Sequence, residues 1–188
     1  MLLGRFVRGL ARSLTCAAAM IALTGLGTSS LVAQDGDPGV TYADILQGFS
    51  DPSSWLTFSG DYSGRRHSPL TQVTPENVHR LTPIWTFQTG TTTRGRGFET
   101  TPLVLDGVLY VTGSNNLAWA LDARTGSVLW ETRIADYQQG YTNSAGPLVV
   151  EGTVINAING CSRFQPESCF ITGHDARTGE ERWRTLTI

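Results

Sequence analysis

The sequence predicts an all-β protein that forms part of a β-propeller. Its main evidence is a repeat, because Asp-Ala-Arg-Thr-Gly occurs at residues 122–126 and again at 175–179. In both copies a tryptophan follows the glycine by four positions, as Trp130 and as Trp183. Five identical residues and a placed tryptophan do not recur by chance in 188 residues, so both stretches represent one structural unit.

A second hairpin is predicted ahead of each copy. Residues 101–110 and 146–155 both read Pro-Leu-Val, then an apolar residue, an acidic residue and glycine, then a further apolar run. An acidic residue and glycine between apolar runs predict a tight turn between two strands. One unit therefore contains two hairpins, or four strands. A degenerate unit ending is expected at residues 83–87, which contain Trp85.

The spacing of the units is typical of propeller blades. Trp130 follows Trp85 by 45 positions, and Trp183 follows Trp130 by 53. Units of four strands at a period near 45 residues are the sequence signature of blades. A closed propeller needs at least four blades, or roughly 160–200 residues of blade alone. We therefore expect residues 55–188 to be the incomplete, N-terminal blades of a longer propeller, in preference to a small open stack.

Each repeat is expected to close a hairpin by the same chemistry. The aspartate side chain accepts hydrogen bonds from backbone N–H groups just ahead of it in the chain. The glycine occupies the position that requires a positive φ. The returning strand then carries the tryptophan, and we expect Trp119, Trp130 and Trp183 to pack between blades.

Residues 1–33 are predicted to be a secretory signal peptide. Three arginines form a positive start, an apolar stretch from Leu14 to Leu26 follows, and Leu31-Val32-Ala33 offers a cleavage site. The apolar stretch is short for a membrane span. Cys16 lies at its beginning, where it does not suit a lipid anchor. We therefore expect a periplasmic protein that is not lipid-anchored.

Charge argues against nucleic acid as a partner. Beyond residue 33 the chain has 11 arginines and 16 acidic residues, a formal charge of −5. An acidic chain of this kind lacks the electrostatic footprint of a nucleic-acid-binding protein.

The segment before the repeats has two parts. Residues 34–54 are polar and rich in turn formers, with one helical turn expected over 42–49, and we expect a lead-in segment with little function of its own. Further on, Thr74-Pro75-Glu76 has the order of an N-cap, a first-turn proline and a first-turn acid, which predicts a helix start. A strand is expected from Leu81 to Trp85.

The chain resembles the pyrroloquinoline quinone (PQQ)-dependent alcohol dehydrogenases. The likeness rests on the block Trp55…Gly60-Asp61…Arg66…Ser68-Pro69-Leu70…Asn77-Val78…Leu81…Trp85, and on the repeats, which are similar to that family's tryptophan-docking motifs. The resemblance implies an eight-bladed propeller with PQQ and Ca²⁺ on its axis, a small alcohol substrate, and cytochrome c or a quinone as electron acceptor. It also implies that the Ca²⁺ ligands and the catalytic aspartate lie beyond residue 188.

Three residues are candidates for cofactor binding. Glu99 lies just ahead of a blade's first strand, where the resemblance implies a glutamate that contacts the quinone. The repeat extends this argument, because Glu99 lies three residues before Pro102 and Ser144 three before Pro147. Ser144, with Asn143 beside it, should therefore face the same funnel from the next blade. The chain has no pair of adjacent cysteines here, unlike members similar to methanol dehydrogenase.

Cys161 and Cys169 are expected to form a disulfide. The second copy has eight more residues than the first between its proline and its aspartate, and both cysteines lie in the longer part. A disulfide there would close a small loop, worth roughly 2–3 kcal/mol by loop entropy. A metal site is the weaker alternative, because only His174 is near and the spacing fits no common zinc pattern. By comparison with Leu121, His174 is expected on a blade surface.

Two functions remain open from the sequence. The first is an exported PQQ-dependent dehydrogenase that oxidises small alcohols, to which this chain contributes opening blades, no catalytic residue and no metal ligand. The second is a non-catalytic propeller of the cell envelope that binds other proteins. The block from Trp55 to Trp85 and the absence of a lipid-anchor cysteine favour the enzyme.

Overall fold

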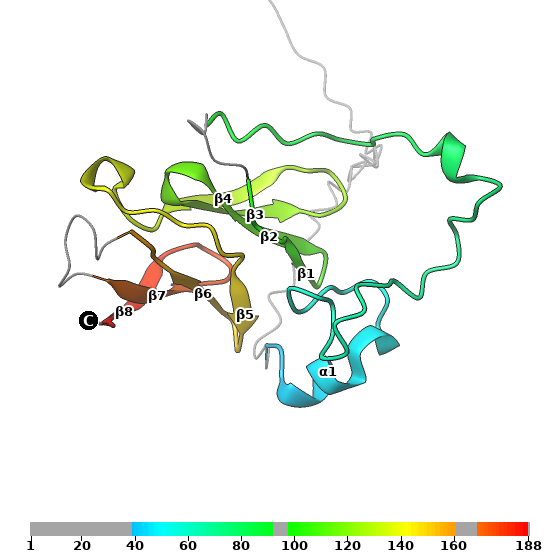
Figure 1. The fold of residues 1–188 in the computed structure, drawn as a ribbon, viewed down its shortest axis with the longest axis horizontal. Coiled ribbons are helices and arrows are strands. Elements are labelled where there is room, and N and C mark those ends of the chain that lie inside the picture. Colours follow the sequence, from blue (N-terminus) through cyan, green and yellow to red (C-terminus); the bar gives the residue numbers. More distant parts are fainter. Residues whose placement is uncertain (1–38, 92–97, 161–168, 188) are drawn as a thin grey trace, which may run out of the picture. The chain divides into compact units, whose positions relative to one another are not determined.

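The computed structural model describes residues 39–91, 98–160 and 169–187, which contain two four-stranded antiparallel sheets (Figure 1). In each sheet the strands lie side by side in chain order. The all-β prediction and the four-stranded units are confirmed. The first sheet consists of β1 (Leu103–Leu105), β2 (Val108–Gly113), β3 (Leu117–Asp122) and β4 (Val128–Arg133). The second consists of β5 (Leu148–Val150), β6 (Thr153–Ala157), β7 (Phe170–Asp175) and β8 (Glu181–Leu186).

Helical elements are short. In the described ranges there is one α-helix, α1 (Tyr42–Gln47), together with the 3-10 turns η1 (Gly48–Ser50), η2 (Val78–Arg80), η3 (Ser114–Asn116) and η4 (Tyr137–Gln139). α1 begins at a capping box between Thr41 and Asp44, and with η1 it confirms the helical turn predicted over 42–49. No helix among the described residues is long and apolar enough to cross a membrane. The predicted signal peptide lies outside the described residues.

The first hairpin of each sheet turns at its acidic residue and glycine. Asp106 and Gly107 have φ values of 49° and 76°, and Glu151 and Gly152 have φ values of 45° and 64°. Two successive residues with positive φ define the turn that matches the twist of the paired strands. The registers Leu105↔Val108 and Val150↔Thr153 place these residues at the loop, so both predicted hairpins are confirmed.

The repeated Asp-Ala-Arg-Thr-Gly turns have the predicted chemistry. Oδ1 of Asp122 accepts hydrogen bonds from the backbone N–H groups of Arg124 (3.0 Å) and Thr125 (2.7 Å). Asp175 makes the same two contacts in the second copy, at 2.8 and 3.0 Å. Gly126 and Gly179 close the turns with φ values of 72° and 75°.

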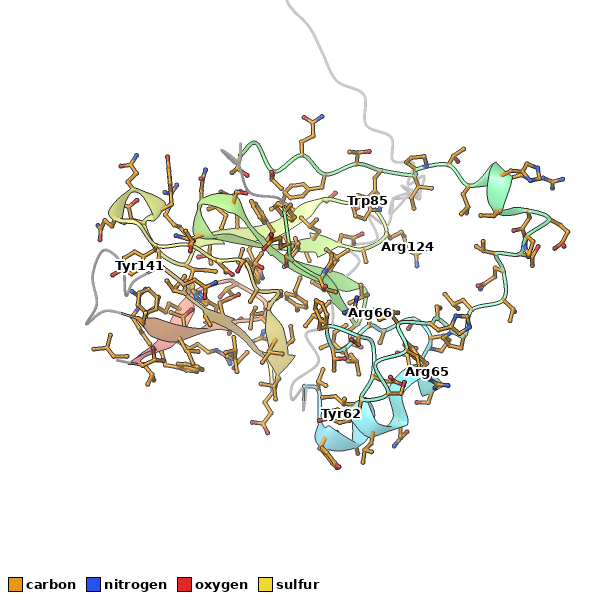
Figure 2. All side chains as sticks on the ribbon, viewed as in Figure 1. Tyr62, Arg65, Arg66, Trp85, Arg124 and Tyr141 are labelled. Atoms are coloured by element: carbon orange, nitrogen blue, oxygen red, sulfur yellow. The ribbon has the colours of Figure 1, made fainter. Side chains whose placement is uncertain are left out.

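Each of these turns receives a tryptophan from the chain before it. Nε1 of Trp130, on β4, donates to the backbone oxygen of Ala176 at 2.9 Å. Its ring covers Gly179, where a Cβ atom would lie only 2.8 Å from the ring. Trp85 repeats the contact on the first sheet, donating to Ala123 at 3.2 Å and covering Gly126, beside Arg124 in Figure 2. The docking of Trp130 confirms that it packs between blades.

The core between the two sheets is made by alternate residues of neighbouring strands. Its buried members from the first sheet include Leu103, Tyr110, Ala118, Ala120 and Trp130, and those from the second include Val149, Val154 and Phe170, together with Ala176 in the turn after β7. Successive side chains of a strand point to opposite faces. The intervening residues Val111, Leu117, Trp119 and Leu121 therefore form a separate cluster on the other face, against Phe87.

The other two predicted tryptophans differ from Trp130. Trp119 is buried in the cluster that faces Phe87, with ring centres 5.6 Å apart, and its Nε1 donates to Glu131. Trp183 remains 39% exposed and its ring covers Gly173 of its own sheet. Of the three, Trp130 is the one that packs between the two described sheets.

Two predictions before the blades are corrected. Residues 81–87 form no strand, because no neighbouring strand in the described part of the chain supplies ladder hydrogen bonds. Trp85 is held there by its side chain. At Thr74 the chain makes a turn, in which Asn77 and Val78 donate to the Thr74 carbonyl, followed by the 3-10 helix η2 in place of an α-helix.

His174 is also corrected, because it is buried and not on a blade surface. It is 1% exposed, with Nδ1 3.1 Å from the oxygen of Gly179 and Nε2 3.0 Å from Oγ1 of Thr172. The equivalent Leu121 is equally buried. The side chain at this position of the repeat is therefore buried in both copies. Hydrogen bonds to nearby residues allow the polar His174 side chain to be buried there.

The chain ahead of the blades contacts both sheets. Gly39 lies against the β5–β6 turn so closely that a Cβ atom would be 2.2 Å from Cα of Glu151. Trp55 pairs with β1 through two backbone hydrogen bonds to Val104, of 2.8 and 3.0 Å. Val40 is buried. The segment thus has a packing role beyond that of a connector.

Gly179→Ala should destabilise the protein more than Gly152→Ala. Both changes place an alanine at positive φ, which costs roughly 1–2 kcal/mol. At Gly179 the added methyl group also meets the Trp130 ring, whereas at Gly152 nothing lies within 4 Å. We expect an additional loss of about 1–3 kcal/mol in the free energy of unfolding, measured by urea titration. Equal losses would show that the docking contact is unimportant.

Asp122→Asn should have an effect that depends on pH. Hydrogen bonds from the backbone and hydroxyl of Thr125, helped by the backbone of Arg124, lower the pKa of Asp122 below its ordinary value. A lowered pKa in the folded state stabilises the protein above the pKa of the unfolded state, near 4, and this contribution is lost as the pH falls through the folded value. The stability difference between wild type and variant, measured by urea titration, should therefore shrink from pH 6 to pH 3. A constant difference would contradict this assignment.

Candidate functional site

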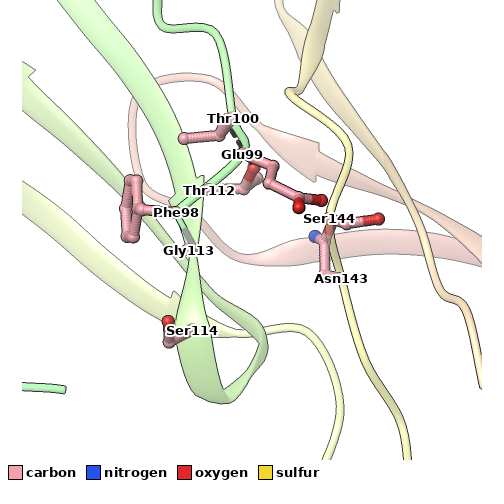
Figure 3. Close-up of a pocket in the computed structure, with 8 residues that line it drawn as sticks. All are labelled: Phe98, Glu99, Thr100, Thr112, Gly113, Ser114, Asn143 and Ser144. Carbon is pink, nitrogen blue, oxygen red and sulfur yellow. Dashed lines mark hydrogen bonds between the residues drawn. The ribbon is translucent and has the colours of Figure 1, made fainter. Parts of the chain in front are cut away.

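The three predicted cofactor residues lie around one hollow. Its lining residues are Phe98, Glu99, Thr100, Thr112, Gly113, Ser114, Asn143 and Ser144 (Figure 3). Glu99 lies on the segment that enters β1, and Asn143 and Ser144 lie on the segment that enters β5. Figure 3 shows the Glu99 carboxylate directed toward the Asn143–Ser144 segment. The structure thus brings together residues from two blades, as the repeat comparison predicted.

The position of the hollow follows from the strand order. β1 and β5 begin at the same end of the blades, opposite the Asp-Ala-Arg-Thr-Gly turns. Glu99 and Ser144 hold equivalent positions in adjacent copies, so they become neighbours across the blade boundary. Both also line a second hollow, whose apolar walls include Phe58, Leu103 and Leu148. A polar group beside apolar surface is typical of small-molecule sites.

Asn143 contributes a hydrogen-bond donor that has no partner among the described residues. Its Oδ1 accepts from the backbone N–H of Ala145 at 3.1 Å, which fixes the orientation of the amide. Its Nδ2 is buried, and no described residue accepts from it. Buried donors are nearly always satisfied by protein, water or ligand. The amide therefore suits an acceptor bound in the hollow.

Ser144 supplies a second donor. Its Oγ accepts a hydrogen bond of 2.9 Å from Nδ2 of Asn159, so the hydroxyl proton is not used in that contact. Ser144 is exposed, as is Glu99. Together with Asn143, it gives the hollow two donors beside one carboxylate. That set can bind a ligand that presents carbonyl or carboxylate oxygens.

Metal binding has little support in the described hollow. Glu99 is the single carboxylate among its eight lining residues. A Ca²⁺ ion takes six to eight oxygen ligands, commonly from several carboxylates. Across the part of the chain that the structure describes, no three His, Cys, Asp or Glu side chains are grouped to hold a metal.

One of the two cysteines of the predicted disulfide lies outside the described part of the chain. Cys161 lies outside the residues that the structure describes, whereas Cys169 packs against the core between the sheets. The pairing stays a prediction.

Sequence reasoning missed the supporting residues of the hollow. Thr112 and Gly113 come from the end of β2, and Phe98 covers Gly113, where a Cβ atom would lie 2.3 Å from its ring. The first hairpin contained a signal for Thr112. Because β1 and β2 pair in antiparallel register, a residue at the end of β2 must lie beside the segment that enters β1.

Comparison with known proteins connects the fold to one family. Residues 55–141 match the family described as glucose/ethanol/alcohol dehydrogenase, β-propeller domain, of the PQQ class. The quinohemoprotein alcohol dehydrogenase ADH-IIG of Pseudomonas putida is 28% identical over 90% of this chain and 30% of its own length. Its solved structure aligns with a TM-score of 0.51 and 26% identity, over 81% of this chain and 30% of that one.

Two further relatives are also named as dehydrogenases of alcohols. The 1-butanol dehydrogenase (cytochrome c) of Thauera butanivorans is 32% identical over 74% of this chain and 20% of its own length. The lanthanide-dependent methanol dehydrogenase of Methylorubrum extorquens is 27% identical over 80% of this chain and 33% of its own length. The chain thus spans a third or less of these relatives. With its two meandering sheets and its docked tryptophans, the chain belongs to the PQQ-dependent alcohol dehydrogenase family, as part of the β-propeller domain.

Proposed function

We propose that this chain forms the opening blades of an exported dehydrogenase that oxidises small alcohols with PQQ. The observation that supports this most directly is the hollow shared by Glu99, Asn143 and Ser144 across a blade boundary. Its unpartnered amide donor, its serine hydroxyl and its carboxylate suit a ligand rich in oxygen and ring nitrogen. The relatives are named as alcohol dehydrogenases, which supports an alcohol as the substrate.

The described residues contribute binding and orientation. The electron-accepting chemistry is supplied by PQQ when it is bound. Asn143 Nδ2 and the Ser144 hydroxyl would donate hydrogen bonds to oxygen atoms of the bound cofactor. The Glu99 carboxylate would accept a hydrogen bond from an O–H or N–H group of the ligand. Phe98 and Gly113 form one wall of the hollow.

The remaining parts of the reaction belong to other parts of the polypeptide. Since the hollow has one carboxylate, we place the Ca²⁺ ligands and the catalytic aspartate beyond residue 188. A lanthanide in place of Ca²⁺ is compatible with the name of one relative. Cytochrome c is the proposed electron acceptor by analogy with the 1-butanol dehydrogenase, and a quinone is the alternative. The arginines and apolar stretch of residues 1–33 support export to the periplasm.

Asn143→Asp should weaken PQQ binding to the complete protein by about tenfold or more. The change removes the unpartnered donor and places a negative charge beside an acidic ligand, at a cost of about 1.5–3 kcal/mol. Binding is measured by titration of PQQ fluorescence. Asn77→Asp is the matched control, because Asn77 lies in the turn before η2 and lines no part of the hollow. Lack of PQQ binding by the wild type would favour a non-catalytic scaffold.

Residues 34–188 alone should not oxidise alcohols. Because we place the catalytic aspartate and the Ca²⁺ ligands elsewhere in the polypeptide, PQQ and Ca²⁺ added to the purified fragment should not support turnover. The assay follows reduction of an artificial electron acceptor with ethanol or butanol as substrate. Turnover above that of free PQQ would contradict the placement of the catalytic groups elsewhere.

A further inference from the structure

Thr112 connects the two segments that carry the proposed cofactor residues. It is 1% exposed, and its hydroxyl donates to the backbone oxygen of Ala145 at 2.6 Å. Its Oγ1 also lies 3.0 Å from Oγ1 of Thr100. Because the Thr112 proton is used toward Ala145, Thr100 is the donor in the second bond. A directed chain of hydrogen bonds thus runs from Thr100 through Thr112 to Ala145.

These hydrogen bonds connect residues that directly follow the proposed cofactor-binding residues. Thr100 follows Glu99, and Ala145 follows Ser144. The two segments also touch at Gly146, where a Cβ atom would lie 2.8 Å from the oxygen of Thr101 and 3.5 Å from Oγ1 of Thr100. The two segments pack so closely at Gly146 that no side chain fits between them, and this packing helps to fix the separation of Glu99 from Ser144.

The hydroxyl of Thr112 is not a requirement of the blade itself. The registers Leu103↔Tyr110 and Leu148↔Ile155 align the two copies and place Ala157 where the first blade has Thr112. The second blade thus forms the same four-stranded sheet with alanine at this position. A buried hydroxyl present in one copy and dispensable in the other indicates a role at the blade boundary.

We propose that Thr112 is a positioning residue, which holds Glu99 and the Asn143–Ser144 pair at the separation that the ligand requires. Thr112 itself is buried and its two hydrogen bonds are partly buried, and shielding from water strengthens such bonds and restricts motion. The link to a ligand rests on the proposed function. The coupling of the two segments does not, since it follows from the contacts of Thr112 alone.

The test compares Thr112→Val with Thr112→Ser in the complete protein. Valine keeps the shape and removes the hydroxyl, whereas serine keeps the hydroxyl. Hydrogen–deuterium exchange in residues 98–102 and 142–147 should be about fivefold to tenfold faster in Thr112→Val, and PQQ affinity should fall by a similar factor. In Thr112→Ser, the exchange rates and the PQQ affinity should both stay close to those of the wild type.

Thr172→Val is the matched control for loss of a buried hydroxyl. Thr172 is 0% exposed and bonds to His174, but it lines no part of the hollow. It should leave exchange in both segments and PQQ affinity unchanged. If Thr112→Val does not fold, Thr100→Val serves as the second variant, because Thr100 is only partly buried. It should speed exchange in 98–102 and leave 142–147 protected by the Thr112–Ala145 bond.

The outcomes separate this inference from the proposed function. Failure of the wild type to bind PQQ overturns the proposed function, and exchange then decides the coupling by itself. If the two segments exchange in Thr112→Val as slowly as in the wild type, the proposed coupling is wrong. Faster exchange with unchanged PQQ affinity overturns the positioning role. Faster exchange in Thr172→Val as well would show a general loosening of the core, and would also overturn it.

Discussion

The contact between a tryptophan and the glycine turn of the following blade organises this structure. It makes three demands at one place: a backbone at positive φ, no Cβ atom under the ring, and a carbonyl oxygen for the indole N–H. Gly179 and Ala176 meet these demands for Trp130, and Gly126 and Ala123 meet them for Trp85. The aspartate that caps each turn holds the backbone in the required shape. The two copies of the repeat are therefore identical in sequence because each must make the same contact with a neighbouring unit.

The two ends of the blades have different tasks. The glycine turns and docked tryptophans lie at one end, where they join successive units. The segments that enter β1 and β5 lie at the other end, where the hollow forms. Because the docking contacts align one blade with the next, equivalent residues such as Glu99 and Ser144 come to face the same space. Binding chemistry can then differ between copies while the scaffold stays the same, since Glu99 and Ser144 differ in charge at equivalent positions.

Particular residues show where sequence reasoning succeeded and where it failed. The hairpins, their turn residues and the meeting of Glu99 with Ser144 were predictable, since each followed from local turn chemistry or from alignment of the two copies. His174 was misplaced because a polar side chain was taken as a sign of exposure, whereas hydrogen bonds to Gly179 and Thr172 allow its burial. Residues 81–85 were taken for a strand, although a strand requires a neighbour that those residues lack in the described part of the chain. Thr112 was missed because its partners are 12 and 33 positions away.

The sequence alone determined the class of fold, the unit of four strands, the turns and the family. These features depend on residues close together in the chain, or on a pattern that recurs at a fixed spacing. Only the tertiary structure decided which side chains are buried between the blades, which donor of Asn143 lacks a partner, and how Thr112 joins two segments. Those properties depend on distances between residues far apart in the chain, which exist only after the blades have packed against each other.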